Sequence, residues 1–244
     1  MSETTYDIAD MLDSLGMTTA AIHWKQILND PEFGNFTAQQ LFREVITPQY
    51  LEAMNKRYET NLKFSRLMEK SARIENLKTG NGRKYNDETV QQILTFRFIT
   101  TGLNIGIYGK TGAGKSYFTS ALCNEACRLN YRCQFRDYCD MMDELLRLSR
   151  ENMTKYTKKL KYYARLRILF IDDFCISRYS EDGIKILYHL LKSRADLHYP
   201  TVFNTQYEPS EWSKWLSDDP GCFGKLDGIR RRLTTGCTVE IVKL

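Results

Sequence analysis

The chain has 244 residues and a formal net charge of +5, and its composition is 42% hydrophobic and 27% charged. This length is enough to bury the core of one ordinary domain with an appendage, or of two small domains. No run of apolar residues is long enough to span a membrane, and the N-terminus is acidic and polar where a secretory signal would be basic and then apolar. We therefore expect a cytoplasmic protein without a membrane partner.

The first eighty residues show helical spacing of apolar side chains and no convincing strand. This pattern predicts a small all-helical N-terminal domain over residues 1–80, which would contact DNA, other subunits, or both. Apolar positions fall on one face of residues 8–15, and a second helical run over residues 21–28 is stopped by Pro31.

A capping box is predicted over residues 37–40, where it would open the next helix. Pro48 suits the first turn of a further helix that extends to about Glu69. The Gly-containing stretch 79–82 is the best candidate for a linker between this domain and the rest of the chain.

Basic residues are concentrated in two stretches. Residues 56–84 hold nine basic and three acidic residues, and residues 147–167 hold eight basic and one acidic residue, so the two stretches sum to +13 and the remainder to −8. Such concentration predicts a polyanion partner, although a solvated charged face is the alternative for the first stretch. The DNA-binding candidates are Lys63, Arg66, Lys70, Arg73, Lys155, Lys158, Lys159 and Lys161.

Tyr156, Tyr162 and Tyr163 alternate with the basic residues of the second stretch, a composition that suits phosphate backbones with occasional stacking. No helix resembles a base-reading element. We therefore expect weakly sequence-specific binding to double-stranded DNA.

From about Tyr85 the pattern becomes an alternation of strands and helices, which is typical of an α/β fold with a parallel sheet sandwiched by helices. We assign residues 81–244 to this second domain. Its expected helices cover residues 87–98, 117–128, 137–148 and 180–195, and its expected strands cover residues 105–108, 131–136, 167–171, 201–204 and 238–242.

A glycine-rich loop follows the strand at residues 105–108 and fits the phosphate-binding pattern in which backbone N–H groups surround a phosphate. Lys115 would reach the β- and γ-phosphates, and the Ser116 hydroxyl would bind Mg²⁺. The nucleotide-binding candidates are Gly109, Lys110, Thr111, Gly112, Ala113, Gly114, Lys115, Ser116 and Tyr117.

Two carboxylates end the apolar strand at residues 167–171, and this is a Walker B pattern. Asp172 is expected to hold Mg²⁺, and Asp173 to polarise the attacking water. Thr205 and Gln206 end a neighbouring strand and could orient that water or bind the γ-phosphate. Arg232 closes a run of three arginines; structural and DNA-contacting roles compete there with an arginine that acts on the nucleotide of a neighbouring subunit.

Seven cysteines contain no Cys-x-x-Cys pair, and with three histidines a zinc site is not expected. We interpret the cysteines as reduced and mostly buried.

The phosphate loop, the Ile-Asp-Asp-Phe box at Asp172, the segment from Thr205 to Trp212 and the Arg232–Leu233 ending resemble the IstB-like family. Its members are AAA+ ATPases that help insertion sequences transpose, close to the DnaC helicase loaders and the initiator DnaA. The resemblance implies ATP and Mg²⁺ as cofactors, Thr205 or Gln206 as sensor 1, and Arg232 as the trans-acting arginine.

The resemblance further implies a homo-oligomer with ATP at subunit interfaces, which would deliver DNA to a transposase and disassemble on hydrolysis. Two departures stand out: Asp173 replaces a frequent Glu, and the chain ends after the last core strand, so no C-terminal lid domain is expected. The alternatives are a DnaC-like helicase loader and, from another class, a small-molecule kinase with the same phosphate loop.

Overall fold

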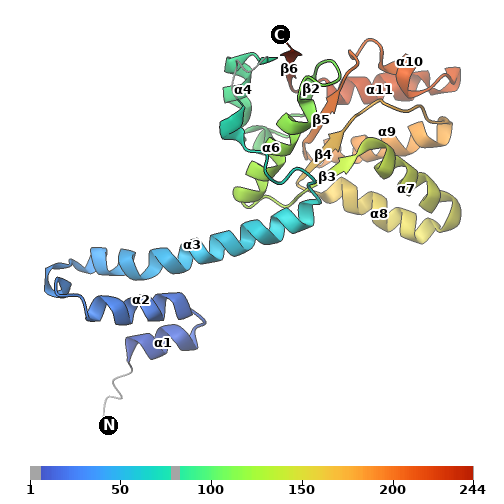
Figure 1. The fold of residues 1–244 in the computed structure, drawn as a ribbon. Coiled ribbons are helices and arrows are strands. Elements are labelled where there is room, and N and C mark those ends of the chain that lie inside the picture. The colour runs from blue at the N-terminus through green and yellow to red at the C-terminus, as the bar shows by residue number, and fades with distance from the viewer. Residues whose placement is uncertain (1–6, 78–82, 244) are drawn as a thin grey trace. The chain divides into compact units, whose positions relative to one another are not determined.

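The computed structural model describes residues 7–77 and 83–243 (Figure 1). The chain forms two compact units, Met1–Glu59 and Thr60–Leu244, which divide inside one long helix. This division precedes the boundary at residue 80 that the sequence suggested, and the expected linker at residues 79–82 lies outside the described residues. None of the described helices is both long and apolar enough to cross a bilayer.

The first unit is helical, as expected from its apolar spacing. It contains α1 (Ile8–Ser14), α2 (Thr18–Leu28), a 3₁₀ turn η1 (Phe33–Asn35) and the larger part of α3 (Ala38–Ser65). The predicted capping box is confirmed, because Thr37 Oγ1 accepts a hydrogen bond from the backbone N–H of Gln40 while Gln40 Oε1 accepts one from the N–H of Thr37.

The helix boundary predicted at Pro48 is wrong, because Pro48 lies inside the continuous helix α3. Proline lacks the N–H that this position would donate within the helix, so one helical hydrogen bond is not made here. Side chains that follow Pro48 bond the first turn of α2: the backbone N–H of Ala20 donates to Gln49 Oε1 at 3.2 Å, and the Thr19 hydroxyl donates to Glu52.

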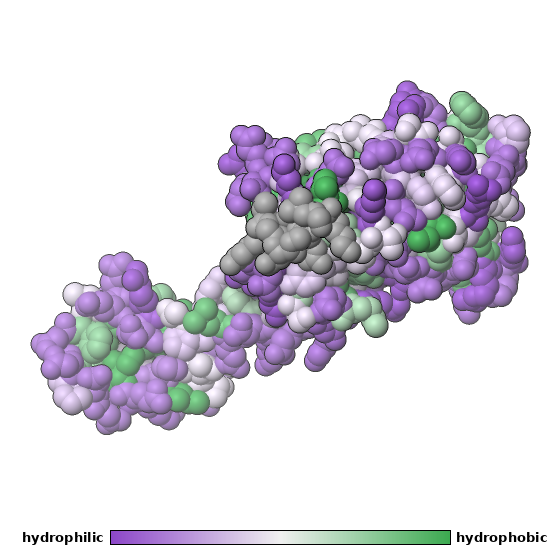
Figure 2. Space-filling view, turned by 45° about the horizontal axis from the view of Figure 1, so that its top comes forward, coloured by the Kyte–Doolittle hydropathy of each residue, from purple (hydrophilic) through white to green (hydrophobic). Residues whose placement is uncertain are grey.

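This unit buries few large side chains. Among its described residues, the buried apolar ones are Ala9, Ala20, Ala21 and Val45. Hydrophobic side chains are visible among hydrophilic ones on its surface in Figure 2. Those exposed include Ile8, Met11, Leu15, Ile22, Leu28, Phe42, Tyr50 and Leu51.

The second unit is built on a five-stranded parallel sheet, which confirms the predicted fold class. The strands are β2 (Ile105–Tyr108), β3 (Cys133–Asp137), β4 (Ile168–Asp172), β5 (Thr201–Thr205) and β6 (Cys237–Glu240), in the order β3-β4-β5-β2-β6. A small antiparallel pair joins β1 (Arg83–Lys84) to β7 (Val242–Lys243).

Helices cover both faces of this sheet, as a parallel sheet requires. Figure 1 shows α6 (Lys115–Arg128) on one face and α9 (Glu181–Asp196) with α11 (Phe223–Leu233) on the other. The pair α7 (Tyr138–Glu151) and α8 (Met153–Arg165) lies at the β3 edge. Shorter elements are η2 (Ile74–Asn76), α4 (Asp87–Leu94), α5 (Phe98–Thr101), α10 (Trp212–Leu216) and η3 (Pro220–Cys222).

Two elements differ from the sequence prediction. The helix expected over residues 87–98 breaks after Leu94, and Phe96 takes a left-handed backbone with φ of 54° before α5 begins. Helix α8 was not predicted, because its many charges hid the apolar stripe of Tyr156, Leu160 and Tyr163 that packs against the core.

Arg194 connects the elements at the end of the sheet where the strands begin, opposite the phosphate loop. Its side chain is 1% exposed, and within residues 7–77 and 83–243 no carboxylate is among its hydrogen-bond partners. It donates instead to Thr201 Oγ1 and to the carbonyls of Tyr163, Leu166 and Pro200. Burial lowers the pKa of this guanidinium to about 9, so it stays charged at neutral pH and joins the end of α8 to the starts of β4 and β5.

Candidate functional site

The glycine-rich loop connects β2 to α6 at the carboxyl edge of the sheet, where ligands bind in open α/β folds. Gly112 and Gly114 have φ of 78° and 98°, a left-handed backbone that side chains with a Cβ disfavour. Gly109 has φ of 153°, and a Cβ there would lie 2.5 Å from the carbonyl oxygen of Ile241. Glycine is therefore required in this loop for two reasons: the left-handed backbone at Gly112 and Gly114, and the close contact between Gly109 and the backbone of Ile241.

Lys115 is the first residue of α6, and only 7% of it is exposed. Its Nζ donates to the carbonyl oxygen of Lys110 at 3.2 Å, so the side chain folds back over the loop. Burial lowers the pKa of this ammonium, and the charges of Asp173 and Asp172 oppose that shift. The lysine and the two carboxylates are therefore electrostatically coupled in one site.

The two carboxylates occupy different backbone positions. Asp172 is the last residue of β4, and Asp173 follows it with a left-handed φ of 53°. Burial raises the pKa of the Asp173 carboxyl, the charge of Asp172 raises it further, and Lys115 lowers it. A left-handed backbone of this kind is sparsely populated outside glycine and is often found at functional sites.

A hydroxyl and a carboxylate suited to Mg²⁺ lie together. Ser116 and Asp172 line a pocket of about 590 Å³ that also contains Asp137, the residue paired with Asp172 on the neighbouring strand. Magnesium prefers a few oxygen ligands of this kind and completes its shell with water and phosphate oxygens. The donor set therefore fits Mg²⁺ beside the phosphate loop.

Asn204, which was not among the predicted site residues, joins the two halves of the site. It is fully buried on β5, and its Nδ2 donates to Asp172 Oδ1 and, at 3.0 Å, to the Thr119 hydroxyl on α6. Its Oδ1 accepts from the backbone N–H of Asp173 at 3.0 Å. A polar residue directly after the apolar pair Val202 and Phe203 was the signal in the sequence, but its inward direction depends on the strand register.

Gln206 touches the phosphate loop, and Thr205 has a different role. Gln206 Oε1 accepts a hydrogen bond from the Thr111 hydroxyl at 2.7 Å, and its Nε2 donates to the Tyr207 hydroxyl at 2.9 Å. Thr205 is fully buried, and its Oγ1 accepts from the backbone N–H of Tyr207. Of the two predicted sensor residues, Gln206 is the one that contacts the loop.

The three arginines of α11 have separate partners. Arg230 and Arg231 both pair with Asp227, at 2.7 and 3.1 Å, and the Arg231 side chain is 76% exposed. Arg232 donates to the carbonyl oxygen of Gly228 at 2.8 Å. Its guanidinium also lies 4.8 Å from the centre of the Tyr188 ring. In this structure Arg232 is thus held by its own chain.

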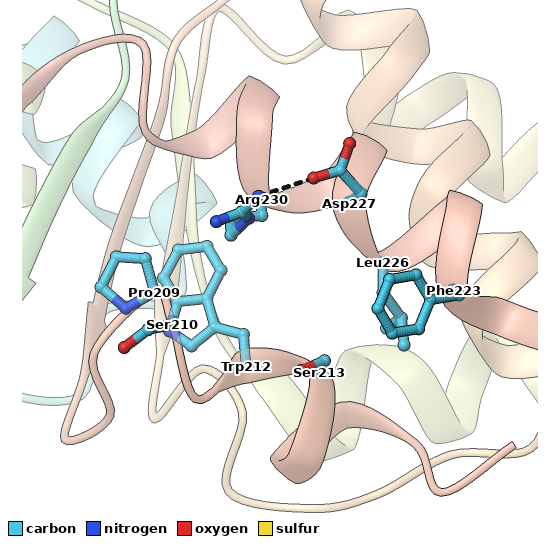
Figure 3. Close-up of a pocket in the computed structure, with 8 residues that line it drawn as sticks. All are labelled: Pro209, Ser210, Trp212, Ser213, Phe223, Leu226, Asp227 and Arg230. Carbon is cyan, nitrogen blue, oxygen red and sulfur yellow. Dashed lines mark hydrogen bonds and ion pairs between the residues drawn. The ribbon is translucent and has the colours of Figure 1, made fainter. Parts of the chain in front are cut away.

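A smaller pocket of about 220 Å³ lies beside these arginines (Figure 3). It is lined by Arg230 and Asp227 of α11 and by Pro209, Ser210 and Trp212, which follow β5. The segment after β5 therefore lies against α11.

The basic residues of α8 divide into exposed and paired members. Lys155, Lys158 and Lys161 are exposed, whereas Lys159 forms an ion pair with Glu144 at 2.7 Å. Tyr163 is fully buried and donates to the same Glu144 carboxylate at 2.6 Å. Lys159 and Tyr163 therefore have structural roles, and the expected stacking by Tyr163 is wrong.

A pocket of about 520 Å³ adjoins α8. Lys158, Lys161 and Arg165 line it from the helix, and Arg132 lines it with its guanidinium 4.0 Å from the centre of the Phe64 ring. The pocket combines several cations with an aromatic ring.

The earlier basic stretch does not form one helical face. Lys63 lies on α3, but the helix ends at Ser65 and Arg66 has a left-handed φ of 57°. Lys70 and Arg73 follow in irregular structure, where Arg73 Nη1 donates to the carbonyl oxygen of Lys70 at 2.6 Å. The DNA-binding candidates Lys63, Arg66, Lys70 and Arg73 therefore do not share one helix.

Known structures share this fold. DnaA of Aquifex aeolicus, solved with AMPPCP bound, has a TM-score of 0.58 and 21% identity, covering 72% of this chain and 51% of that chain. The DnaC helicase loader has a TM-score of 0.56 and 17% identity, covering 70% of this chain and 97% of that chain. At these identities the similarity shows the fold, which is the predicted AAA+ core.

Sequence comparisons identify the family. An ATP-binding protein of insertion sequence IS1162 from Pseudomonas fluorescens is 26% identical over 141 residues, which are 58% of this chain and 60% of that relative. The match thus spans less than two thirds of that protein's length. The family model described as IstB-like ATP binding protein matches residues 10–240, and the chain therefore belongs to the IstB-like ATP-binding family that its motifs predicted.

Proposed function

We propose that this chain is an ATPase that hydrolyses ATP to ADP and phosphate at the site between β2, β4 and β5. The observation that carries the proposal is the joint position of Lys115 on the phosphate loop and of the coupled carboxylates Asp172 and Asp173. The loop and the start of α6 offer backbone N–H groups and a positive helix end to the phosphates. Lys115 would stabilise the negative charge that develops on the β- and γ-phosphate oxygens during transfer.

Mg²⁺ would be held by Ser116 and Asp172, and it would neutralise charge on the phosphate oxygens. Asp173 would accept a proton from the attacking water, helped by its raised pKa. Asn204 would position both carboxylates, because it hydrogen-bonds the side chain of Asp172 and the backbone of Asp173. Gln206 would sense the nucleotide through its contact with Thr111.

DNA is the proposed polyanion partner, and α8 is its proposed contact surface. Three exposed lysines of this helix, together with Arg132 and Arg165 at the adjoining pocket, offer cations to a phosphate backbone. Contacts of this kind position a duplex without reading its bases, so binding should depend weakly on sequence.

A salt series tests the DNA proposal. Affinity for unrelated duplexes should fall steeply with salt, and Lys158→Ala with Lys161→Ala should flatten the slope by about one per phosphate contact removed. Lys185→Ala, on the exposed side of α9, is the matched control and should leave the slope unchanged. Strong preference for one duplex, or an unchanged slope in the double variant, would contradict this surface.

We further propose that ATP assembles several copies on DNA, with an arginine of α11 completing the site of a neighbouring subunit. Three adjacent arginines at one helix end, one of them 76% exposed, support this arrangement. Arg232 would have to leave Gly228 and Tyr188 to reach another subunit's γ-phosphate. The assembled state would persist until hydrolysis.

The partner protein is proposed to be a transposase, because the relative from Pseudomonas fluorescens is named for an insertion sequence. The fold shared with the DnaC helicase loader favours replicative helicase loading as the second candidate. Affinity capture of this chain against the transposase encoded beside it and against the replicative helicase separates the two. Binding to the helicase alone would overturn the transposase assignment.

A further inference from the structure

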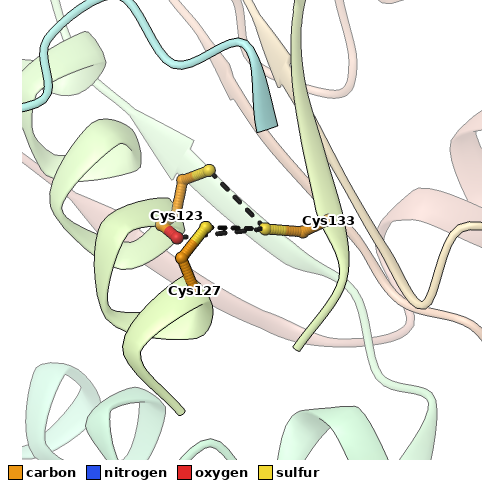
Figure 4. Close-up of side chains that lie close together, drawn as sticks. All are labelled: Cys123, Cys127 and Cys133. Carbon is orange, nitrogen blue, oxygen red and sulfur yellow. Dashed lines mark hydrogen bonds between the residues drawn. The ribbon is translucent and has the colours of Figure 1, made fainter. Parts of the chain in front are cut away.

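Three cysteines that are apart in the sequence converge inside the second unit. Cys123 and Cys127 lie one turn apart on α6, and Cys133 is the first residue of β3. All three are fully buried. Figure 4 shows their side chains directed toward one another, with Cys133 Sγ 3.8 Å from Cys123 Sγ and 3.6 Å from Cys127 Sγ.

These separations match the geometry of a metal–thiolate centre. A Zn–S bond of about 2.3 Å and a tetrahedral angle place two sulfur ligands about 3.8 Å apart. Packed thiols lie at similar separations, so the convergence of a third sulfur is the informative feature. All three sulfurs lie within 4.8 Å of one another, and within the described parts of the chain no other residues form such a group.

A metal ion binds thiolates and releases their protons, so ion binding at this buried cluster would be coupled to deprotonation of the three thiols.

The ligand set selects the class of ion. Among the described residues, neither a histidine nor a carboxylate joins the three sulfurs. Soft thiolates favour Zn²⁺ or Cu⁺ and bind Mg²⁺ poorly. We propose that Cys123, Cys127 and Cys133 bind one thiophilic metal ion, Zn²⁺ or Cu⁺, separate from the Mg²⁺ of the nucleotide site. Binding replaces three thiol protons with the ion and involves no oxidation or reduction.

An ion at this position would link α6 to β3 beside the nucleotide site. Helix α6 begins at Lys115 on the phosphate loop, and β3 ends at Asp137 beside Asp172. The last turns of α3 reach the cluster through Asn61, whose Nδ2 lies 3.5 Å from the carbonyl oxygen of Cys127. The site would therefore stabilise the frame that carries the loop and the carboxylates, without taking part in hydrolysis.

Metal content tests this inference. The full chain is purified without chelators under a thiol-free reductant, and its zinc and copper are measured by mass spectrometry. We expect one equivalent of zinc or copper per chain, lost in Cys133→Ser and kept in Cys237→Ser, whose cysteine lies on β6 outside the cluster. Zinc identifies the ion as Zn²⁺, and copper identifies it as Cu⁺.

A second measurement uses the unaltered chain, so a variant that fails to fold leaves the inference testable. Protein produced in cobalt-supplemented, zinc-depleted medium should show the charge-transfer absorption of thiolate-bound Co²⁺. The inference would be overturned if the purified chain contained no zinc or copper and the cobalt-grown protein lacked this absorption. It would also be overturned if Cys133→Ser kept the bound ion. ATP turnover is not the readout, so failure here leaves the proposed ATPase function untouched.

Discussion

Replacing Asn204 with alanine should separate the positioning of the carboxylates from the stability of the core. The substitution removes two hydrogen bonds donated by Nδ2 and one accepted from the backbone N–H of Asp173. Because Asn204 is fully buried, the N–H of Asp173 loses its partner in a site with limited access to water. At about 1 kcal/mol per hydrogen bond, we expect a loss of about 3 kcal/mol in the free energy of unfolding.

Turnover should fall by more than this loss of stability explains. Asp172 loses the donor that orients it, and Asp173 loses the contact that holds its strained turn. Removing such outer partners of a metal site typically costs about 10- to 100-fold in activity or metal affinity. ATP binding through Lys115 and the loop should remain, because Asn204 makes none of its hydrogen bonds to them.

The matched control is Asn124→Ala. Asn124 is also a buried asparagine, and its Nδ2 donates to the carbonyls of Lys70 and Ala72 at 2.9 Å each, away from the carboxylates. Both variants are compared by thermal unfolding, ATP binding and turnover per folded molecule. Equal turnover in Asn204→Ala and Asn124→Ala would refute the reasoning that Asn204 positions Asp172 and Asp173.

Three other predictions concern the same site. Asp173→Asn should bind ATP but hydrolyse it slowly and trap the assembled state, as sizing by light scattering with ATP and ADP would show; normal turnover would remove Asp173 as the water-activating group. Folding favours the protonated form of Asp173, so metal-free stability should fall as pH rises through its raised pKa. Asp172→Asn should weaken this loss of stability with rising pH, and it should raise the free energy of unfolding of the metal-free protein at neutral pH by up to about 1 kcal/mol after solvent screening. Thermal unfolding with a chelator at acidic and neutral pH measures this change, and an unchanged pH dependence would show that the two carboxylates are not coupled. Arg232→Ala mixed with Lys115→Ala should recover part of the turnover that each lacks alone if the arginine acts between subunits, whereas no recovery would assign Arg232 a role within its own chain.

The phosphate loop and the strand that bears Asp172 were predictable because their signals are local. Glycines at Gly112 and Gly114 supply torsions that the loop needs, and an apolar strand that ends in acidic residues places them at the sheet edge. The family resemblance rests on the same motifs, and the family match over residues 10–240 confirms it.

Positions that depend on packing were not predictable in the same way. The helix start expected at Pro48 is absent, because α3 begins at Ala38 and continues through this proline to Ser65. The side chains of Gln49 and Glu52 hydrogen-bond the first turn of α2, a contact that the local sequence does not reveal. In the sequence Asn204 is an ordinary strand residue. Its contact with α6 depends on the register of β5 against β4, which the sequence alone does not give. The partner of Lys159 is Glu144, which lies on another helix and is not apparent from a run of basic residues.

The cysteines show the same limit for a candidate metal site. Spacing between Cys123, Cys127 and Cys133 matches no common metal-binding pattern, because two ligands come from one helix and the third from a strand. Their convergence appears once β3 packs beside α6.

Steady-state ATP turnover by the unaltered chain, measured with Mg²⁺ in the presence and absence of duplex DNA, tests the central claim most directly. We expect Mg²⁺-dependent release of phosphate that duplex DNA increases and that Lys115→Ala abolishes together with ATP binding. Turnover that survives Lys115→Ala, or a complete lack of hydrolysis by the unaltered chain on DNA, would contradict the assignment of this site as an ATPase.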